Sequence, residues 1–390
     1  MLRLLRSRFV GVGKYLDLRS YLTREPVMLT LLFAIAVVFF SAVSGLSRIY
    51  HAQQTSLGNR WFARGVNDLK RQRFEPAVNE FRTALLYSRD NYAYQFNLAE
   101  ALIGLRQTDQ ANAYLVNLWD RQPENGLVNL ELARIAAHKG TTDHALRYYH
   151  NAIYATWPDG EETGRRDARL ELIEYLLRID AKTQAQSELI ALAANLGDEF
   201  EQHLKVGHLF IQAQDYEDAL AQYRLSLRLN RSDPVALAGA GLAAFKLGRY
   251  PLALRYLQGA VTADPHDAQS AERLKTTELV LRMDPFQRMI SVAKRDRIVI
   301  DAFATAGDRL KSCSTANAGT SHTTSQDGLS ESWAKMKPQI TESGLRRDPD
   351  LVERAMELVF RIERETTVTC GVPQEKDNVL LLIAKLHEGS

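Results

Sequence analysis

The stretch that decides the fold is residues 74–85, FEPAVNEFRTAL, because its pattern returns along the chain at a nearly fixed interval. Its fourth residue, an alanine, recurs after 34 residues in four of five steps, and after 40 residues in the step between the third and fourth copies. The alanines are Ala77, Ala111, Ala145, Ala185, Ala219 and Ala253. A recurrence of this length indicates an internal structural repeat.

Two other positions recur with each alanine. Four residues later stands a large apolar or aromatic residue: Phe81, Leu115, Tyr149, Leu189, Tyr223 and Leu257. Twelve residues earlier the residue is small in five copies and isoleucine in the fourth: Gly65, Ala99, Ala133, Ile173, Gly207 and Gly241. This spacing predicts two helices per repeat, closely packed at the small residues. Neither helix can bury its apolar stripe alone, so neighbouring repeats must stack.

The pattern resembles the tetratricopeptide repeat, whose signature runs Trp-x2-Leu-Gly-x2-Tyr and then Ala, Phe, Ala and Pro over 34 residues. The first copy carries Trp61, Gly65, Ala77, Phe81 and Ala84 at matching positions. The resemblance covers residues 58–265 and implies an all-α fold, a right-handed TPR-type α-solenoid of about six helix pairs. It also implies that the partners are other proteins or peptide segments, bound in a concave groove.

In this family the groove is lined mainly by the first helix of each repeat, called helix A here, and the second is called helix B. Projecting the repeat register onto helix A gives two candidate groove residues per repeat. They are Phe62, Val66, Asn97, Glu100, Arg134, His138, Glu174, Arg178, Lys205, His208, Leu242 and Lys246. The set lacks the paired Lys and Asn residues by which some relatives clamp a C-terminal carboxylate.

Residues 27–46 form an uncharged apolar stretch that is long enough to cross a bilayer as one helix. Basic residues outnumber acidic ones in residues 1–26, which predicts a cytoplasmic basic segment before the membrane helix. The chain is therefore expected to be a single-pass protein of a bacterial inner membrane, with its repeats in the periplasm. A cleaved signal peptide is the alternative reading of the same stretch.

Beyond the repeats, residues 266–312 predict capping helices, and the residues expected to be buried in the longer of them are Met289, Val292, Ile298, Ile300, Phe303 and Ala306. Residues 313–330 are rich in Ser and Thr and predict a loop. Residues 331–390 predict a helical module whose last helix spans residues 375–387. Only two cysteines occur, Cys313 and Cys370, and an oxidising compartment would favour a disulfide between them over free thiols.

Composition limits the function. The 49 basic and 47 acidic residues nearly balance, which gives no bulk electrostatic case for nucleic acid. The sequence shows no catalytic constellation, no metal-ligand set and no cofactor motif, so no catalytic, metal or cofactor residue is predicted. A membrane-anchored scaffold that organises an envelope protein complex is the leading hypothesis. The alternatives are a regulatory subunit or enzyme with its chemistry in the C-terminal module, and an organelle import receptor with cytosolic repeats.

Overall fold

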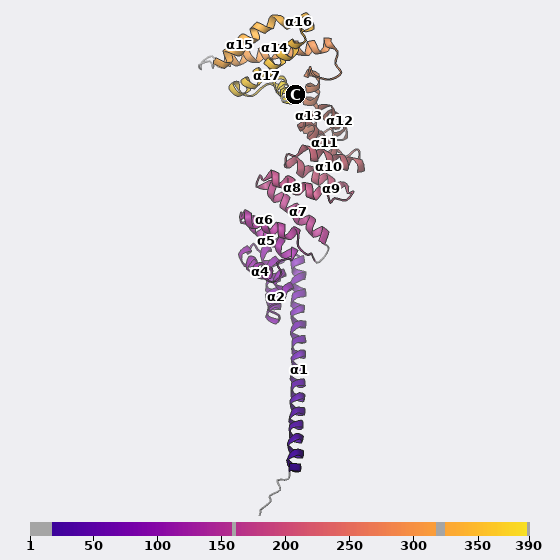
Figure 1. Ribbon diagram of the computed structural model, residues 1–390, viewed down its shortest axis with the longest axis vertical. Helices are drawn as coiled ribbons and strands as arrows, with labels where there is room; N and C mark the ends of the chain where they lie inside the picture. The colour runs from indigo at the N-terminus through magenta and orange to yellow at the C-terminus, as the bar shows by residue number, and fades with distance from the viewer. Residues whose placement is uncertain (1–17, 158–160, 317–323, 388–390) are drawn as a thin grey trace, which may run out of the picture. The chain divides into compact units, whose positions relative to one another are not determined.

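The computed structural model describes residues 18–157, 161–316 and 324–387, and they are almost entirely helical (Figure 1). No strand occurs within these ranges; the backbone of Asn125 and Thr156 forms one isolated parallel bridge. The chain divides into two compact units, Met1–Arg165 and Arg166–Ser390. The all-α fold expected from the sequence is confirmed.

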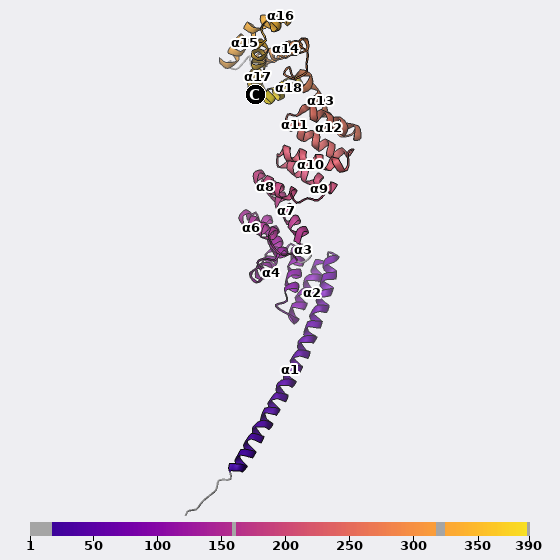
Figure 2. The same ribbon diagram turned by 45° about the vertical axis from the view of Figure 1, so that its right-hand side comes forward.

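The first unit contains three packed helix pairs. They follow one another as α1 (Leu18–Lys70), α2 (Phe74–Tyr87), α3 (Tyr92–Gly104), α4 (Thr108–Arg121), α5 (Gly126–His138) and α6 (Thr142–Ile153). The long helix α1 continues without a break from the apolar stretch into helix A of the first repeat (Figure 2). Gly65 of α1 packs against the ring of Phe81 in α2, where an added Cβ would lie 2.5 Å from the ring.

The second unit holds three more helix pairs and the C-terminal module. The pairs are α7 (Glu161–Arg178, which begins in the first unit), α8 (Lys182–Ala193), α9 (Phe200–Gln212), α10 (Tyr216–Leu229), α11 (Pro234–Lys246) and α12 (Tyr250–Ala263). The capping helix α13 (Ala268–Met283) follows. The module comprises α14 (Val292–Ala316), α15 (Thr324–Met336), the 3₁₀ helix η1 (Lys337–Gln339), α16 (Glu342–Arg347), α17 (Asp350–Cys370) and α18 (Glu375–His387).

The positions that recur in the sequence repeats are the positions that form the core of the structure. All six alanines that define the interval are 0% exposed, and the six large residues four positions later are at most 3% exposed. The small residues on helix A are buried as well, and so is Ile173, which replaces them in the fourth repeat. Because the same positions are buried in every copy, the six helix pairs share one packing scheme.

The turn from helix A to helix B also repeats, with one residue of left-handed conformation in each copy. These residues are Gln72, Arg106, Gly140, Asp180, Gln214 and Gly248, with φ between 58° and 72°. In each turn the next residue donates its N–H to the carbonyl five positions earlier, for example Gln107 to Leu102 at 2.9 Å. This is the Schellman closure of a helix end, in which glycine carries no steric penalty.

Replacing Gly140 with alanine should therefore lower the stability of the first unit by about 1 kcal/mol. No atom lies within 4 Å of the added Cβ, so the loss would come from the backbone conformation alone. Arg106→Gly, at the same point of the preceding repeat, should raise stability by a similar amount. Urea denaturation of the two variants checks the pair, and equal effects of the same sign would contradict this explanation.

Helix α1 is the one helix within the described ranges that is long and apolar enough to cross a membrane. The apolar window, which begins at Val27, has no buried residue. Its exposed side chains include Phe33, Phe39 and Phe40, each at least 68% exposed. The window thus has no partner within the described protein, which fits either a membrane span or a signal sequence.

The structure departs from the sequence expectation around the Ser/Thr-rich segment. Helix α14 continues through Ala316, and α15 begins at Thr324, so residues 313–316 and 324–330 are helical rather than loop. Residues 317–323 lie outside the described ranges. Cys313, Leu329 and Leu310 are buried, and this packing supports helix where composition favoured a loop.

The last helix is part of the core. Val379, Leu380, Ile383 and Ala384 of α18 are at most 2% exposed and join a cluster formed by α14 and α17. Tyr250 of the sixth repeat belongs to the same cluster. The C-terminal module is therefore packed onto the end of the last repeat.

Candidate functional site

In the first unit, the predicted groove residues of helices α3 and α5 meet at a group of charges. Glu100 is partly buried, and Arg134, which is 45% exposed, pairs with Glu131 on its own helix. The pKa of Glu100 is raised to about 7, because burial raises it most, the charge of Glu131 also raises it, and the charge of Arg134 only partly lowers it. These two candidates, Glu100 and Arg134, therefore act on each other across neighbouring A helices.

The remaining candidates of the first unit differ in exposure. Asn97 is partly buried, and its amide donates to the carbonyl of Ala93, 2.9 Å away on its own helix. His138 is exposed. Phe62 and Val66 pack against the core instead, and the ring of Phe62 stacks on that of Tyr94 with 4.9 Å between centroids. The expected apolar start of the groove therefore serves largely as core.

In the second unit, Glu174 of α7 and Lys205 of α9 form an ion pair of 3.2 Å between neighbouring A helices. His208 is exposed and lies 3.0 Å from the amide nitrogen of Gln212. Arg178 and Lys246 are exposed, and Leu242 is partly buried. The ion pair brings two of the predicted residues together.

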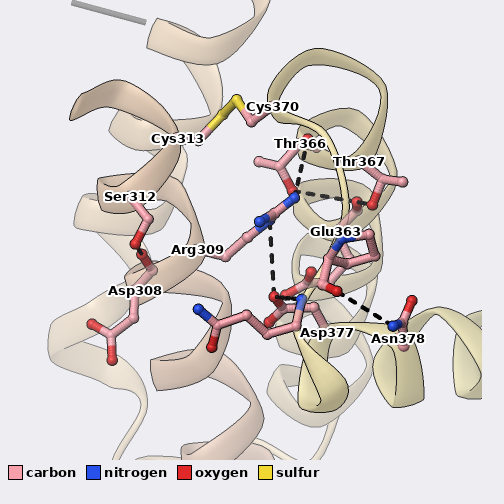
Figure 3. Close-up of polar contacts among 12 residues, drawn as sticks. Asp308, Arg309, Ser312, Cys313, Glu363, Thr366, Thr367, Cys370, Asp377 and Asn378 are labelled. Carbon is pink, nitrogen blue, oxygen red and sulfur yellow. Dashed lines mark hydrogen bonds and ion pairs between the residues drawn. A yellow bond between two sulfur atoms is a disulfide. The ribbon is translucent and has the colours of Figure 1, made fainter. Parts of the chain in front are cut away.

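A second polar site, which the sequence gave no reason to expect, lies in the C-terminal module (Figure 3). Arg309 of α14, Glu363 of α17 and Asp377 of α18 gather between the three helices that carry them. Arg309 donates to the carbonyl of Gly371 at 2.8 Å, and its Nε lies 3.9 Å from a carboxylate oxygen of Asp377. Glu363 is fully buried, and neither of its side-chain oxygens has a hydrogen-bond partner within the described residues.

Burial also governs the protonation of this cluster. The pKa of Glu363 is raised to about 8, because burial raises it most, the charge of Asp377 also raises it, and the charge of Arg309 only partly lowers it. Glu363 is therefore largely uncharged at neutral pH. A single charge on Arg309 then balances the single charge on Asp377, which lowers the cost of burying the group.

Cys313 and Cys370 border the cluster, and the structure joins their sulfur atoms (Figure 3). Cys313 stands one helical turn beyond Arg309 on α14, and Cys370 is the last residue of α17. Their Cα atoms are 5.5 Å apart, within the range of a disulfide. The link and the charge cluster thus connect the same two helices.

The raised pKa predicts how stability depends on pH. The native state holds a proton on Glu363 up to about pH 8, whereas the unfolded chain releases it near pH 4. The native state therefore binds more protons in this window, so stability should fall as the pH rises from about 4 to about 8. Glu363→Gln should flatten this decline, so that its melting temperature exceeds that of the wild type at pH 9 more than at pH 5.

Glu353→Gln is the matched control, because Glu353 is exposed on the same helix. It should leave the pH profile of the melting temperature unchanged. A wild-type profile that stays parallel to that of Glu363→Gln would show that Glu363 is ionised in the native state at neutral pH.

Within the described ranges, no three His, Cys, Asp or Glu side chains are placed to hold a metal ion. The residues brought together are charged groups that pair with one another, on helix A in each unit and between helices of the module.

A comparison with known protein families agrees with the repeats that the buried positions define. A family model described as tetratricopeptide repeat matches residues 101–161 and 204–268. No curated protein sequence matches the chain.

Several solved structures resemble it at low identity. YrrB, a TPR protein with an unusual peptide-binding site, is 15% identical and covers 50% of this chain and 97% of its own, with a TM-score of 0.40. PilF of Pseudomonas aeruginosa is 15% identical over 56% of this chain and 97% of its own, with a TM-score of 0.40. The C-terminal part of a TPR repeat-containing protein from Cytophaga hutchinsonii is 13% identical over 61% and 92%, with a TM-score of 0.45.

The buried alanine register, the six closed turns and the matched family model lead to one conclusion: this chain contains tetratricopeptide repeats, which the family model matches at residues 101–161 and 204–268.

Proposed function

We propose that this protein is a membrane-anchored scaffold whose helix A surfaces bind segments of other proteins and organise an envelope complex. The observation that carries the proposal is the contrast between core and surface in the repeats. The core positions are the same in all six copies, whereas the exposed helix A positions change, as at Arg134, Glu174 and Lys246. A surface that varies over a constant core provides different contacts along its length.

The membrane part of the proposal rests on helix α1. Its apolar window is exposed, and basic residues predominate before it, which favours an N-terminus in the cytoplasm of a bacterial cell. The repeats would then lie in the periplasm, where an oxidising environment would maintain the link between Cys313 and Cys370. The continuous helix from the apolar stretch into the first repeat would hold the scaffold close to the membrane surface.

Crosslinking and co-purification from membranes tests the binding proposal. Lys246→Glu should reduce the amount of a crosslinked partner, because Lys246 is exposed on helix A of the sixth repeat. Lys335→Glu makes the same charge change on α15, outside the repeats, and should leave recovery unchanged. Partners that are lost equally from both variants would count against binding through helix A.

A thiol-reactive probe that cannot cross membranes tests the topology separately. Intact cells with a permeable outer membrane should label Cys313 and Cys370 only after reduction and unfolding. Labelling without reductant would contradict the bridge, and no labelling even after reduction and unfolding would contradict the periplasmic location.

A further inference from the structure

Four arginines form a basic surface on the B helices of repeats five and six and on the turn that follows the first of them. They are Arg224 and Arg228 on α10, Arg231 in the turn that follows it, and Arg255 on α12. All four are exposed. We call these four residues the arginine surface.

The arginine surface encloses an apolar floor. The four guanidinium-bearing side chains line one open hollow together with Leu227, Leu237 and Tyr256. Leu227 and Tyr256 are each only 9% exposed, and the guanidinium of Arg255 lies over the Tyr256 ring, 5.3 Å from its centroid. A second hollow shares Arg224 and Arg228 and is otherwise lined by Ala221 and Leu225. No acidic residue lines either hollow.

The charges of the arginine surface are also unbalanced. None of the four arginines makes an ion pair with a described residue, although nearby Arg249 pairs with Glu217 at 2.9 Å. The whole chain has a formal net charge of only +2, so this concentration of positive charge is local. Like charges held together repel one another, and an anionic partner would relieve that repulsion.

The spacing of the arginines suits a peptide. Arg224 and Arg228 stand one turn apart, about 6 Å along the helix axis. Every second side chain of an extended peptide is separated by about 7 Å, so two carboxylates in such a segment could each meet one guanidinium. Arginine binds carboxylates through paired hydrogen bonds, and the hollow offers an apolar surface to a neighbouring side chain.

From these observations we infer that the arginine surface is a second docking site, which binds an acidic segment of a partner protein. The segment would carry two Asp or Glu residues separated by one residue, with a large apolar residue next to them. A nucleic acid would need a longer basic track than one cluster on two helices supplies, and it would leave the apolar floor unused. The site is lined by residues of α10 and α12, by Arg231 and by Leu237 of α11, and it includes neither of the predicted groove residues of α11, Leu242 and Lys246, so its occupation would be independent of binding at those residues.

A fluorescent peptide that combines Glu-x-Glu with leucine provides the probe, and its binding to the full chain in detergent is measured by fluorescence anisotropy. The double variant Arg224→Ala, Arg228→Ala should bind about tenfold more weakly or worse, because two charge-assisted contacts are lost. Wild-type binding should weaken as salt increases, and a peptide with lysine in place of glutamate should not bind.

The double variant Lys335→Ala, Arg361→Ala is the matched control, because these residues are exposed on α15 and α17 and their removal changes the net charge by the same two units without touching the arginine surface. It should bind the acidic peptide as the wild type does, and so should Lys246→Glu on helix A. Unchanged affinity in the double arginine variant would overturn the inference. So would loss of peptide binding in Lys246→Glu, or binding of a short single-stranded oligonucleotide but not the peptide. None of these results depends on whether helix A binds a partner.

Discussion

Replacing Phe81 with alanine should destabilise the first unit by about 3–5 kcal/mol, the largest effect expected of any single change in the repeats. The side chain is 0% exposed, and its ring packs against Gly65 and lies 5.7 Å from the ring of Phe62. Truncation would leave a cavity that Gly65, which has no side chain, cannot fill. Chemical denaturation of the full chain in detergent, followed by circular dichroism, gives the measurement.

Leu86→Ala is the control for that prediction, because Leu86 lies on the same helix and is 84% exposed. It should change stability by less than about 0.5 kcal/mol. Similar losses in the two variants would contradict the assignment of Phe81 to the inter-helix core of the repeat.

The second large effect should follow from breaking the link between Cys313 and Cys370. The two residues are separated by 57 positions, and in the chain-entropy model the closed loop contributes about 4 kcal/mol to stability. Cys313→Ala with Cys370→Ala should therefore lower the unfolding midpoint of the C-terminal module. The loss should be observed by hydrogen exchange in α14 and α17, since these helices are joined by the link.

The single variants provide the control. If the bridge is the source of stability, either cysteine change alone should cost nearly as much as both together. Reductant should reproduce the loss in the wild type and have no effect on the double variant. Additive single effects with no response to reductant would instead indicate that the two thiols contribute only by packing.

The repeat architecture could be predicted from the sequence because its signal is redundant. Each copy places a small residue and a large one at the same separation, and a single exception such as Ile173 does not disturb the register. The turns between helices A and B could not be predicted in the same way. Gln72, Arg106, Asp180 and Gln214 adopt the left-handed conformation that glycine would have signalled.

The C-terminal module was less predictable because it contains no repeat, so no second copy supports the interpretation of any one position. Met289 was expected to be buried but is 98% exposed, and Val292 is 53% exposed. Helix α14 does bury Phe303 and Ala306, as expected, together with Val299 and Ala302. Met289 precedes the helix and Val292 is its first residue, so the apolar pattern placed the start of the buried face too early.

The candidate sites, too, could be predicted only in part from the sequence. The register placed Glu174 and Lys205 on neighbouring A helices, where they form an ion pair. It could not indicate Glu363, because a glutamate within a charged helical stretch is usually exposed and only the approach of α14 and α18 buries it. The arginine surface joins residues from two repeats and one turn, so its members are separated in the sequence by residues with other roles.

The central claim is that the helix A surfaces bind protein segments, and site-specific photocrosslinking in membranes tests it most directly. A photoreactive side chain would replace His208 or Lys246 on helix A, and Gln258 or Thr262 on α12 as exposed controls outside both proposed sites. The account predicts the same discrete crosslinked protein from both helix A positions and none from the controls. Crosslinks of equal yield at all four positions, or at the controls alone, would contradict it.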